Sequence, residues 1–185
     1  TTTTLPNGTV GASYSQALAA TGGTPPYSGW TVTVGTLPAG LATAGTLGDR
    51  ADLNANFRDE YYALVPAVSD GADGPPLVTS GLIDPGRCRW GEQPVTFAKR
   101  TFAAPRVDLG KLEGRFPAWA ARKLVPKVLV ANQTRIIEAV ADPDGAWLPG
   151  VPVSTVTPLA GDPDPVRTVW ELAAVLTSPV ASVHA

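Results

Sequence analysis

The stretch KVLVANQTRIIEAVADPDGAWLPGVPVSTVTP, residues 127–158, carries the clearest strand signals of the chain. Residues 127–131 form a short apolar run of the kind found in buried strands. Two further strand-like runs follow, at 135–141 and 151–158, and an Asp-Pro-Asp-Gly segment that favours a turn separates them. We therefore expect these two runs to pair as a hairpin around Asp144-Gly145.

Outward from this stretch, strand and helix patterns continue without an internal repeat. Residues 50–55 read as a strand, and the segment LVTSGLIDPG at 77–86 reads as a short strand that enters a turn. Residues 117–125 predict a helix with Pro at its first position, where the missing N–H does no harm. Residues 167–177 carry apolar side chains at helical spacing. These patterns predict an α/β (α+β) fold with a mixed, twisted sheet and a few helices.

The composition changes near residue 45, which divides the chain into residues 1–44 and 45–185. The first part contains no charged side chain and includes LPNGTVGASYSQALAATGGTPPYSGWTVTVGTLPAGL, residues 5–41, which reads as two short strands around a turn-rich connection. This segment resembles half of a bacterial immunoglobulin-like repeat of surface proteins. Immunoglobulin-like domains are β-sandwiches, and half of one leaves an apolar sheet face uncovered. We therefore expect a partial β segment without a complete core of its own.

The net charge of −2 hides a strongly basic middle block. Residues 87–135 hold eleven basic and three acidic side chains, whereas the segments on either side are acidic. A block of this sign suits a polyanion such as nucleic acid. The alternative is a solvated surface that the flanking acidic residues neutralise in space, and charge alone favours neither.

The second part contains the segments LGDRADLNANFRDEYYALVP, PLVTSGLIDPGRCRWGEQPVTFAKRTFAAPRVDL, LVPKVLVANQTRIIEAVADPDGAWLP and VRTVWELAAVLTSPVAS. These segments resemble the target-recognition region of bacterial N-6 adenine-specific DNA methyltransferases of the restriction–modification type. They extend over about residues 46–185 in the order typical of that family. The region is expected to be truncated at its C-terminus, because the last helical pattern continues toward the end of the chain.

The resemblance implies a bacterial DNA-recognition module that works with a separate catalytic domain. That domain binds S-adenosylmethionine and transfers the methyl group, whereas the region seen here grips double-stranded DNA and reads its sequence. This chain has no cofactor loop, and Thr24-Pro25-Pro26-Tyr27 is read as a turn because Thr is a poor substitute for the Asn or Asp that holds the target amino group. We therefore expect a cytoplasmic fragment that binds DNA without a cofactor and without catalysis of its own.

The turn GLIDPGRCRWG, residues 81–91, is the first group of expected DNA contacts. Arg87 and Arg89 alternate along its exit, which places both on one face of an extended segment and Trp90 on the other. Arginine forks match phosphate oxygens and also the O6 and N7 acceptors of guanine. The alternative is that these arginines pair with the nearby acids Asp84 and Glu92.

The second group is the polar loop that follows the strand at 127–131. Asn and Gln side chains can address adenine, and Arg can address guanine or phosphate, although an ordinary polar turn has the same composition. The pairs at 99–100 and 122–123 are read as phosphate clamps or solvated charges. The complete set of expected DNA-binding residues is Arg87, Arg89, Lys99, Arg100, Lys127, Asn132, Gln133, Thr134 and Arg135.

Other classes of function receive less support from the sequence. The single cysteine, Cys88, rules out an internal disulfide framework and argues against a tetrahedral zinc site. No run of 18 apolar residues exists, so we expect no membrane partner. The alternative function is a secreted or surface immunoglobulin-like adhesion module, and it rests on residues 1–42 alone.

Overall fold

Four antiparallel strands form the main sheet of the protein. The computed structural model describes residues 46–55, 58–132 and 134–178. Contacts along the chain divide it into two units at Ala44–Gly45, and the described residues belong to the second. The expected immunoglobulin-like segment therefore lies outside the described residues, and so do residues 179–185, where the last helical pattern was expected to continue. The strands, in spatial order, are β1 (Ala51–Ala55), β12 (Val153–Pro158), β9 (Lys127–Ala131) and β10 (Ala139–Asp142).

The hairpin expected around Asp144-Gly145 is wrong. Strand β10 pairs with β9, and β12 pairs with β9 on its other side, so β9 lies between the two runs that were expected to pair. The Asp-Pro-Asp-Gly segment folds instead around the carboxylate of Asp142, which accepts hydrogen bonds from the backbone N–H groups of Ala146 and Trp147 at 2.9 and 3.0 Å. This loop directs the chain into β11 (Leu148–Pro149), which leaves the main sheet and pairs in parallel with β3 (Leu77–Val78).

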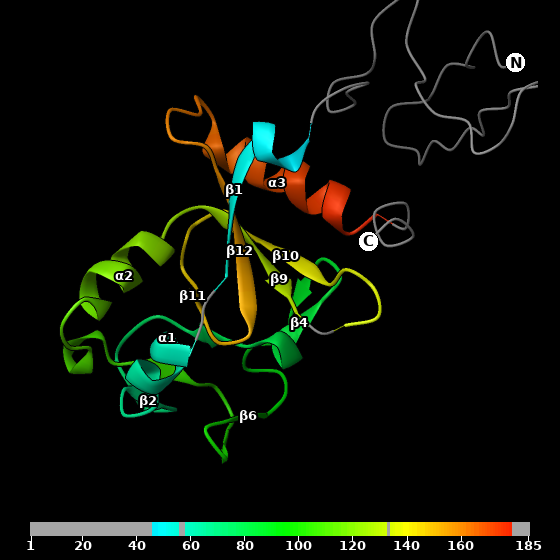
Figure 1. The fold of residues 1–185 in the computed structure, drawn as a ribbon. Coiled ribbons are helices and arrows are strands. Elements are labelled where there is room, and N and C mark those ends of the chain that lie inside the picture. Colours follow the sequence, from blue (N-terminus) through cyan, green and yellow to red (C-terminus); the bar gives the residue numbers. More distant parts are fainter. Residues whose placement is uncertain (1–45, 56–57, 133, 179–185) are drawn as a thin grey trace, which may run out of the picture. The chain divides into compact units, whose positions relative to one another are not determined.

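Helix α3 (Pro165–Leu176) covers one face of the main sheet (Figure 1). It begins where the side chain of Asp164 accepts a hydrogen bond from the backbone of Arg167, and Pro165 stands in the first turn. Its buried side chains pack against alternate residues of the four strands, as the two-residue period of a strand requires. This core cluster consists of Ala51, Val128, Ala139, Ala141, Val156, Val169, Leu172 and Ala173.

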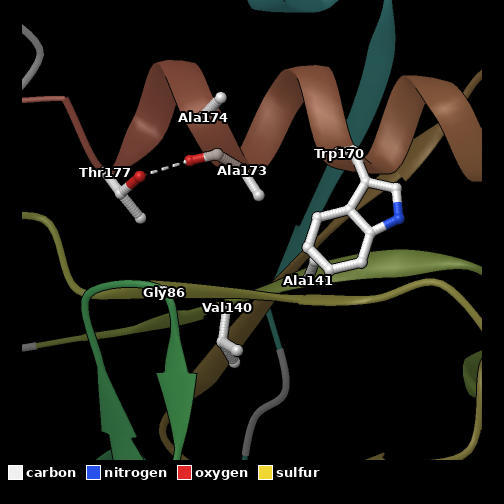
Figure 2. A pocket seen from close by; sticks show the side chains of 7 residues that line it. All are labelled: Gly86, Val140, Ala141, Trp170, Ala173, Ala174 and Thr177. Atoms are coloured by element: carbon white, nitrogen blue, oxygen red, sulfur yellow. Dashed lines mark hydrogen bonds between the residues drawn. The ribbon is translucent and has the colours of Figure 1, made fainter. Parts of the chain in front are cut away.

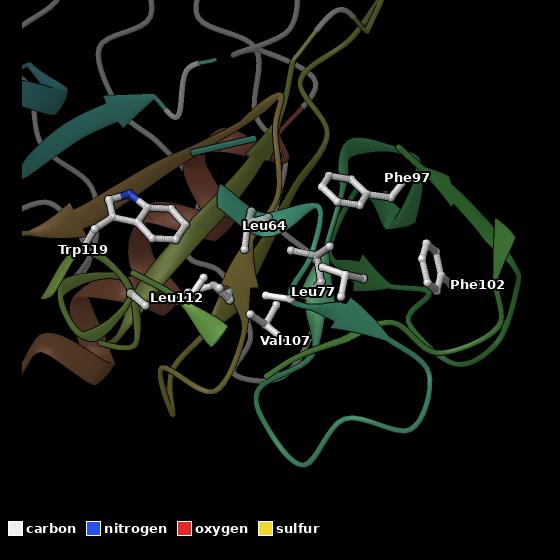
Figure 3. Close-up of a cluster of buried hydrophobic side chains, with 11 residues drawn as sticks. Leu64, Leu77, Phe97, Phe102, Val107, Leu112 and Trp119 are labelled. Atoms are coloured by element: carbon white, nitrogen blue, oxygen red, sulfur yellow. The ribbon is translucent and has the colours of Figure 1, made fainter. Parts of the chain in front are cut away.

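Two further core clusters lie away from α3. One consists of Val78, Leu82, Ile83, Leu129, Ala131, Val140 and Val153. The other brings together helices α1 (Arg58–Leu64) and α2 (Phe116–Lys123) with several short strands, around Leu64, Leu77, Phe97, Val107 and Trp119 (Figure 3).

Short elements complete the fold. The helix predicted at 117–125 is confirmed as α2, whereas α1 has no counterpart among the sequence-based expectations. The remaining elements are the 3-10 helices η1 (Leu47–Asp49), η2 (Ser80–Leu82) and η3 (Leu109–Lys111), and the paired strands β2 (Val68–Ser69) with β8 (Arg106–Val107), β4 (Ile83–Asp84) with β5 (Arg87–Cys88), and β6 (Val95–Phe97) with β7 (Arg100–Phe102).

The predicted α+β class is confirmed. The main sheet is antiparallel throughout. Among the described strands, only β3 and β11 pair in parallel. The main sheet, with β9 at its centre, is what positions the candidate DNA-contacting loop between β9 and β10.

Candidate nucleic-acid interface

The two arginines of the β4–β5 turn are held by nearby acids. The Nη2 atom of Arg87 donates to Glu92 Oε2 at 2.8 Å, and Nε of Arg89 donates to Asp84 Oδ2 at 2.5 Å. The hydrogen bond to Asp84 also raises the pKa of Arg89. The structure therefore shows the alternative pairing for both arginines. Their side chains remain 59% and 38% exposed, so they lie at the surface with their charge compensated.

Trp90 anchors this turn to the rest of the protein. Its indole N–H donates to the carbonyl of Pro105 at 2.8 Å, and its ring packs at the edge of the cluster around Leu82 and Ile83. The guanidinium of Arg106 lies 4.8 Å from the ring centroid and donates to the carbonyl of Gly74 at 2.7 Å. Arg106 therefore helps to hold the turn in place and is not free to contact a ligand.

Lys127 is not at the surface, and its expected role as a DNA contact is wrong for this conformation. It begins β9 directly opposite Asp142 of β10, and the two side chains form an ion pair that is fully buried. Its ammonium group also donates to the carbonyl of Val125 at 3.3 Å. Burial lowers the pKa of Lys127, and the charge of Asp142 opposes that shift. An ammonium group enclosed in this way cannot reach a phosphate.

Lys123, the last residue of α2, is also buried. Its ammonium group donates to Asn54 Oδ1 and Thr155 Oγ1, both at 3.0 Å, on the face of the sheet opposite α3. Burial lowers the pKa of Lys123, while the carboxylate of Glu60 acts against that shift. The reading of Lys123 as a phosphate clamp is therefore wrong, whereas its neighbour Arg122 is exposed.

The loop between β9 and β10 carries the second group of expected contacts. The side chain of Asn132 accepts a hydrogen bond from Ser154 Oγ at 3.1 Å, and the hydroxyl of Thr134 donates to the carbonyl of Ile136 at 2.5 Å. Arg135 is exposed and has no ion pair with any described residue. Gln133 lies outside the described residues. The loop thus carries an exposed cation and two side chains whose positions are fixed by hydrogen bonds.

The hairpin of β6 and β7 places two more cations at the surface. Ala98 and Lys99 connect the strands with φ values of 49° and 61°, the left-handed pair that a tight two-residue turn requires. Such turns normally carry Asn-Gly or Asp-Gly, so no residue pattern indicated this one. Lys99 is exposed in the turn itself, and the guanidinium of Arg100 lies 5.0 Å from the ring centroid of Phe102.

The basic block does not form one continuous face. Lys111 pairs with Asp108 at 3.5 Å and Arg115 pairs with Asp59 at 2.9 Å. Within the described part of the chain, the exposed cations of this block without an acidic partner are Lys99, Arg100, Arg122 and Arg135. They lie on the β6–β7 hairpin, on α2 and on the β9–β10 loop, which are well separated in Figure 1.

A shallow pocket of about 200 Å³ lies between α3, β10 and the β4–β5 turn (Figure 2). Trp170 lines one side of the pocket and is 57% exposed. The hydroxyl of Thr177, which also lines it, donates to the carbonyl of Ala173 at 2.8 Å. The other lining residues are Gly86, Val140, Ala141 and Ala174. Because none of the lining side chains is charged, the pocket does not match a phosphate.

Comparisons with known proteins add no assignment: no family model matches the chain, and neither does any curated protein. Over the described ranges, no cluster of three or more His, Cys, Asp or Glu side chains is arranged to hold a metal ion. None of the helices in those ranges is long and apolar enough to span a membrane.

Proposed function

We propose that the chain is the DNA-recognition portion of a site-specific adenine-N6 DNA methyltransferase. The resemblance of residues 46–185 to that family's target-recognition region motivates the proposal. Within the α+β class, these residues form a DNA target-recognition domain in this proposal. Its partners are double-stranded DNA and a separate catalytic domain that uses S-adenosylmethionine, and its place of action is the cytoplasm, beside chromosomal DNA.

The observation that carries the proposal is the free charge of Arg135 in the β9–β10 loop. Arg135 is exposed without an acidic partner among the described residues, although acidic residues outnumber basic ones in the whole chain. Asn132 directly follows β9 in the same loop, and its carbonyl oxygen accepts a hydrogen bond from Ser154. A guanidinium and an oriented amide in one loop are groups that can read base edges, because both offer paired hydrogen-bonding atoms.

The β6–β7 hairpin supplies a second contact of a different kind. Lys99 and Arg100 are exposed at its turn, where their charges suit phosphate oxygens better than base edges. Arg87 and Arg89 take part only if DNA displaces Glu92 and Asp84 from them. The proposed interface therefore rests first on Arg135 and Lys99.

The test compares two double variants with the same change in net charge. Lys99→Ala/Arg135→Ala removes cations without acidic partners, whereas Lys111→Ala/Arg115→Ala removes cations that pair with Asp108 and Asp59. Duplex binding by the full chain is measured across a salt series. Each lost phosphate contact should reduce the slope of log K against log salt by about 0.9, so the first variant should lose about 0.9 through Lys99, and roughly 1.8 where Arg135 also contacts phosphate. The control should lose less.

Two outcomes would contradict the proposal. The first is an absence of duplex binding at low salt. The second is an equal loss of slope in both double variants, which would indicate attraction by net charge alone. Base reading by Asn132 and Arg135 is then tested by selection of bound duplexes from a randomised pool, in which Arg135→Ala should relax the preference at a defined position.

A further inference from the structure

The two edges of the main sheet differ in how they are protected. At the β10 edge, the β4–β5 turn closes over the strand, and the N–H of Gly86 donates to the carbonyl of Ala139 at 2.8 Å. At the other edge, β1 pairs with β12, and no other strand of the described residues pairs with it. Open edges of this kind are templates for pairing with a further strand.

The register of β1 shows which of its backbone groups are available. The N–H of Leu159 donates to the carbonyl of Arg50, and the residues of an antiparallel pair alternate between bonded and non-bonded positions. Asp52 and Asn54 therefore direct their backbone groups toward β12. The backbone groups of Ala51, Leu53 and Ala55 point outward, and none of them has a partner among the described residues.

We propose that β1 pairs with β1 of a second copy of this chain, in antiparallel orientation about Leu53. Leu53 of one copy then faces Leu53 of the other, and Ala51 faces Ala55. The outward backbone groups of these residues meet as bonded pairs and continue the main sheet across both copies.

The strand can pair with itself without like charges facing each other, and its outward hydrogen-bonding groups match. In this register Asp52 faces Asn54 of the second copy, so no like charges oppose one another. Leu53 is 65% exposed although it lies on the apolar face of the sheet, beside Val156 of β12. β1 also contains no Lys and no Pro, two residues that commonly guard exposed edges. A second copy thus covers Leu53 with an identical side chain.

The first test measures the mass of the full chain in solution by sedimentation. The unsubstituted protein should be a dimer at micromolar concentration, and Leu53→Lys should raise its dissociation constant at least tenfold, because two ammonium groups would then face each other. The matched control is Val166→Lys, which places the same charge at an apolar residue that is 45% exposed on α3. A monomeric parent protein, or a dimer that survives Leu53→Lys, overturns the proposal.

The second test fixes the register and does not depend on a loss of association. In a Cys88→Ser background, Leu53→Cys should form a disulfide-linked dimer under mild oxidation, because directly opposite bonded residues have Cα atoms about 5.5 Å apart. Asp52→Cys should not, because the two copies of that residue are diagonal neighbours roughly 7–8 Å apart. Equal cross-linking at both positions would show random collision and overturn the proposed pairing.

Discussion

Lys127 and Asp142 face each other directly across β9 and β10, and their buried side chains form an ion pair. Asp142 also accepts hydrogen bonds from the backbones of Ala146 and Trp147, so one carboxylate joins the main sheet to the loop that leaves it. The pair explains why a lysine stands at the start of an otherwise apolar strand, and it removes that lysine from the DNA-contacting set.

Substitution of Lys127 should therefore affect stability and not DNA binding. Lys127→Met leaves the carboxylate of Asp142 buried without its cation, which should lower the free energy of unfolding by about 3–5 kcal/mol. Arg122→Met, at an exposed cation, should change it by less than about 0.5 kcal/mol. Urea denaturation followed by circular dichroism measures both.

The same variant separates the two roles considered for Lys127. At a temperature where Lys127→Met is still folded, its salt slope for duplex binding should equal that of the unsubstituted protein. A slope reduced by about one, with unchanged stability, would place Lys127 in contact with phosphate and contradict the buried ion pair.

Gly145 should be difficult to replace, because two separate penalties meet there. Its φ of 63° is left-handed, and an added Cβ would lie 2.5 Å from the carbonyl carbon of Val125. Gly86 has a similar φ of 74° with nothing within 4 Å of the added atom. Gly145→Ala should destabilise the protein by about 3 kcal/mol and Gly86→Ala by about 1 kcal/mol. Equal melting temperatures for the two variants would show that the contact with Val125 relaxes freely.

Release of Arg87 should strengthen DNA binding if the proposed interface extends to the β4–β5 turn. Glu92→Gln removes the acid that holds Arg87 at 2.8 Å and leaves the bond between Arg89 and Asp84 in place. The salt slope should then steepen by about 0.9, because one more cation can reach a phosphate. Glu113→Gln, at an exposed acid, is the control for net charge. Equal steepening in both variants would exclude Arg87 from the interface.

The carboxylate of Glu171 should make part of the stability dependent on pH. Hydrogen bonds from Arg167 and then from Arg50 lower the pKa of Glu171 in the folded protein. A carboxyl whose pKa is lowered by folding stabilises the protein above its unfolded pKa, and this contribution is lost as the pH falls through the folded value. Glu171→Gln should cost about 0.5 kcal/mol at pH 7, since exposed ion pairs contribute little.

The difference between Glu171→Gln and the unsubstituted protein should shrink toward zero below about pH 4, near and below the ordinary glutamate pKa. Urea denaturation at a series of pH values measures it. A difference that stays constant from pH 7 to pH 3 would mean that the carboxylate charge has no part in the effect.

Local patterns of the sequence were sufficient for several elements. The strands at 127–131 and 151–158 and the helices at 117–125 and 167–177 follow from apolar periodicity and from the placement of Pro, both of which act within a few residues. The α+β class follows from these elements. Pairing was not predictable in the same way, because β9 pairs with both runs and separates them. The carboxylate of Asp142, two residues before the expected turn, is bound by Lys127 and by two backbone amides, and these contacts come from the tertiary fold.

The candidate site shows the same limit. The sequence by itself determined that eleven basic residues lie between positions 87 and 135, and that Asp84 and Glu92 were near enough to pair with the arginines of the turn. Only the tertiary structure decided which charges stay free: it buries Lys123 and Lys127, pairs Arg115 with Asp59 from a distant segment, and leaves Arg135 exposed. The physical reason is that the availability of a charge depends on burial and on partners brought together by the fold, and neither is encoded in spacing along the chain.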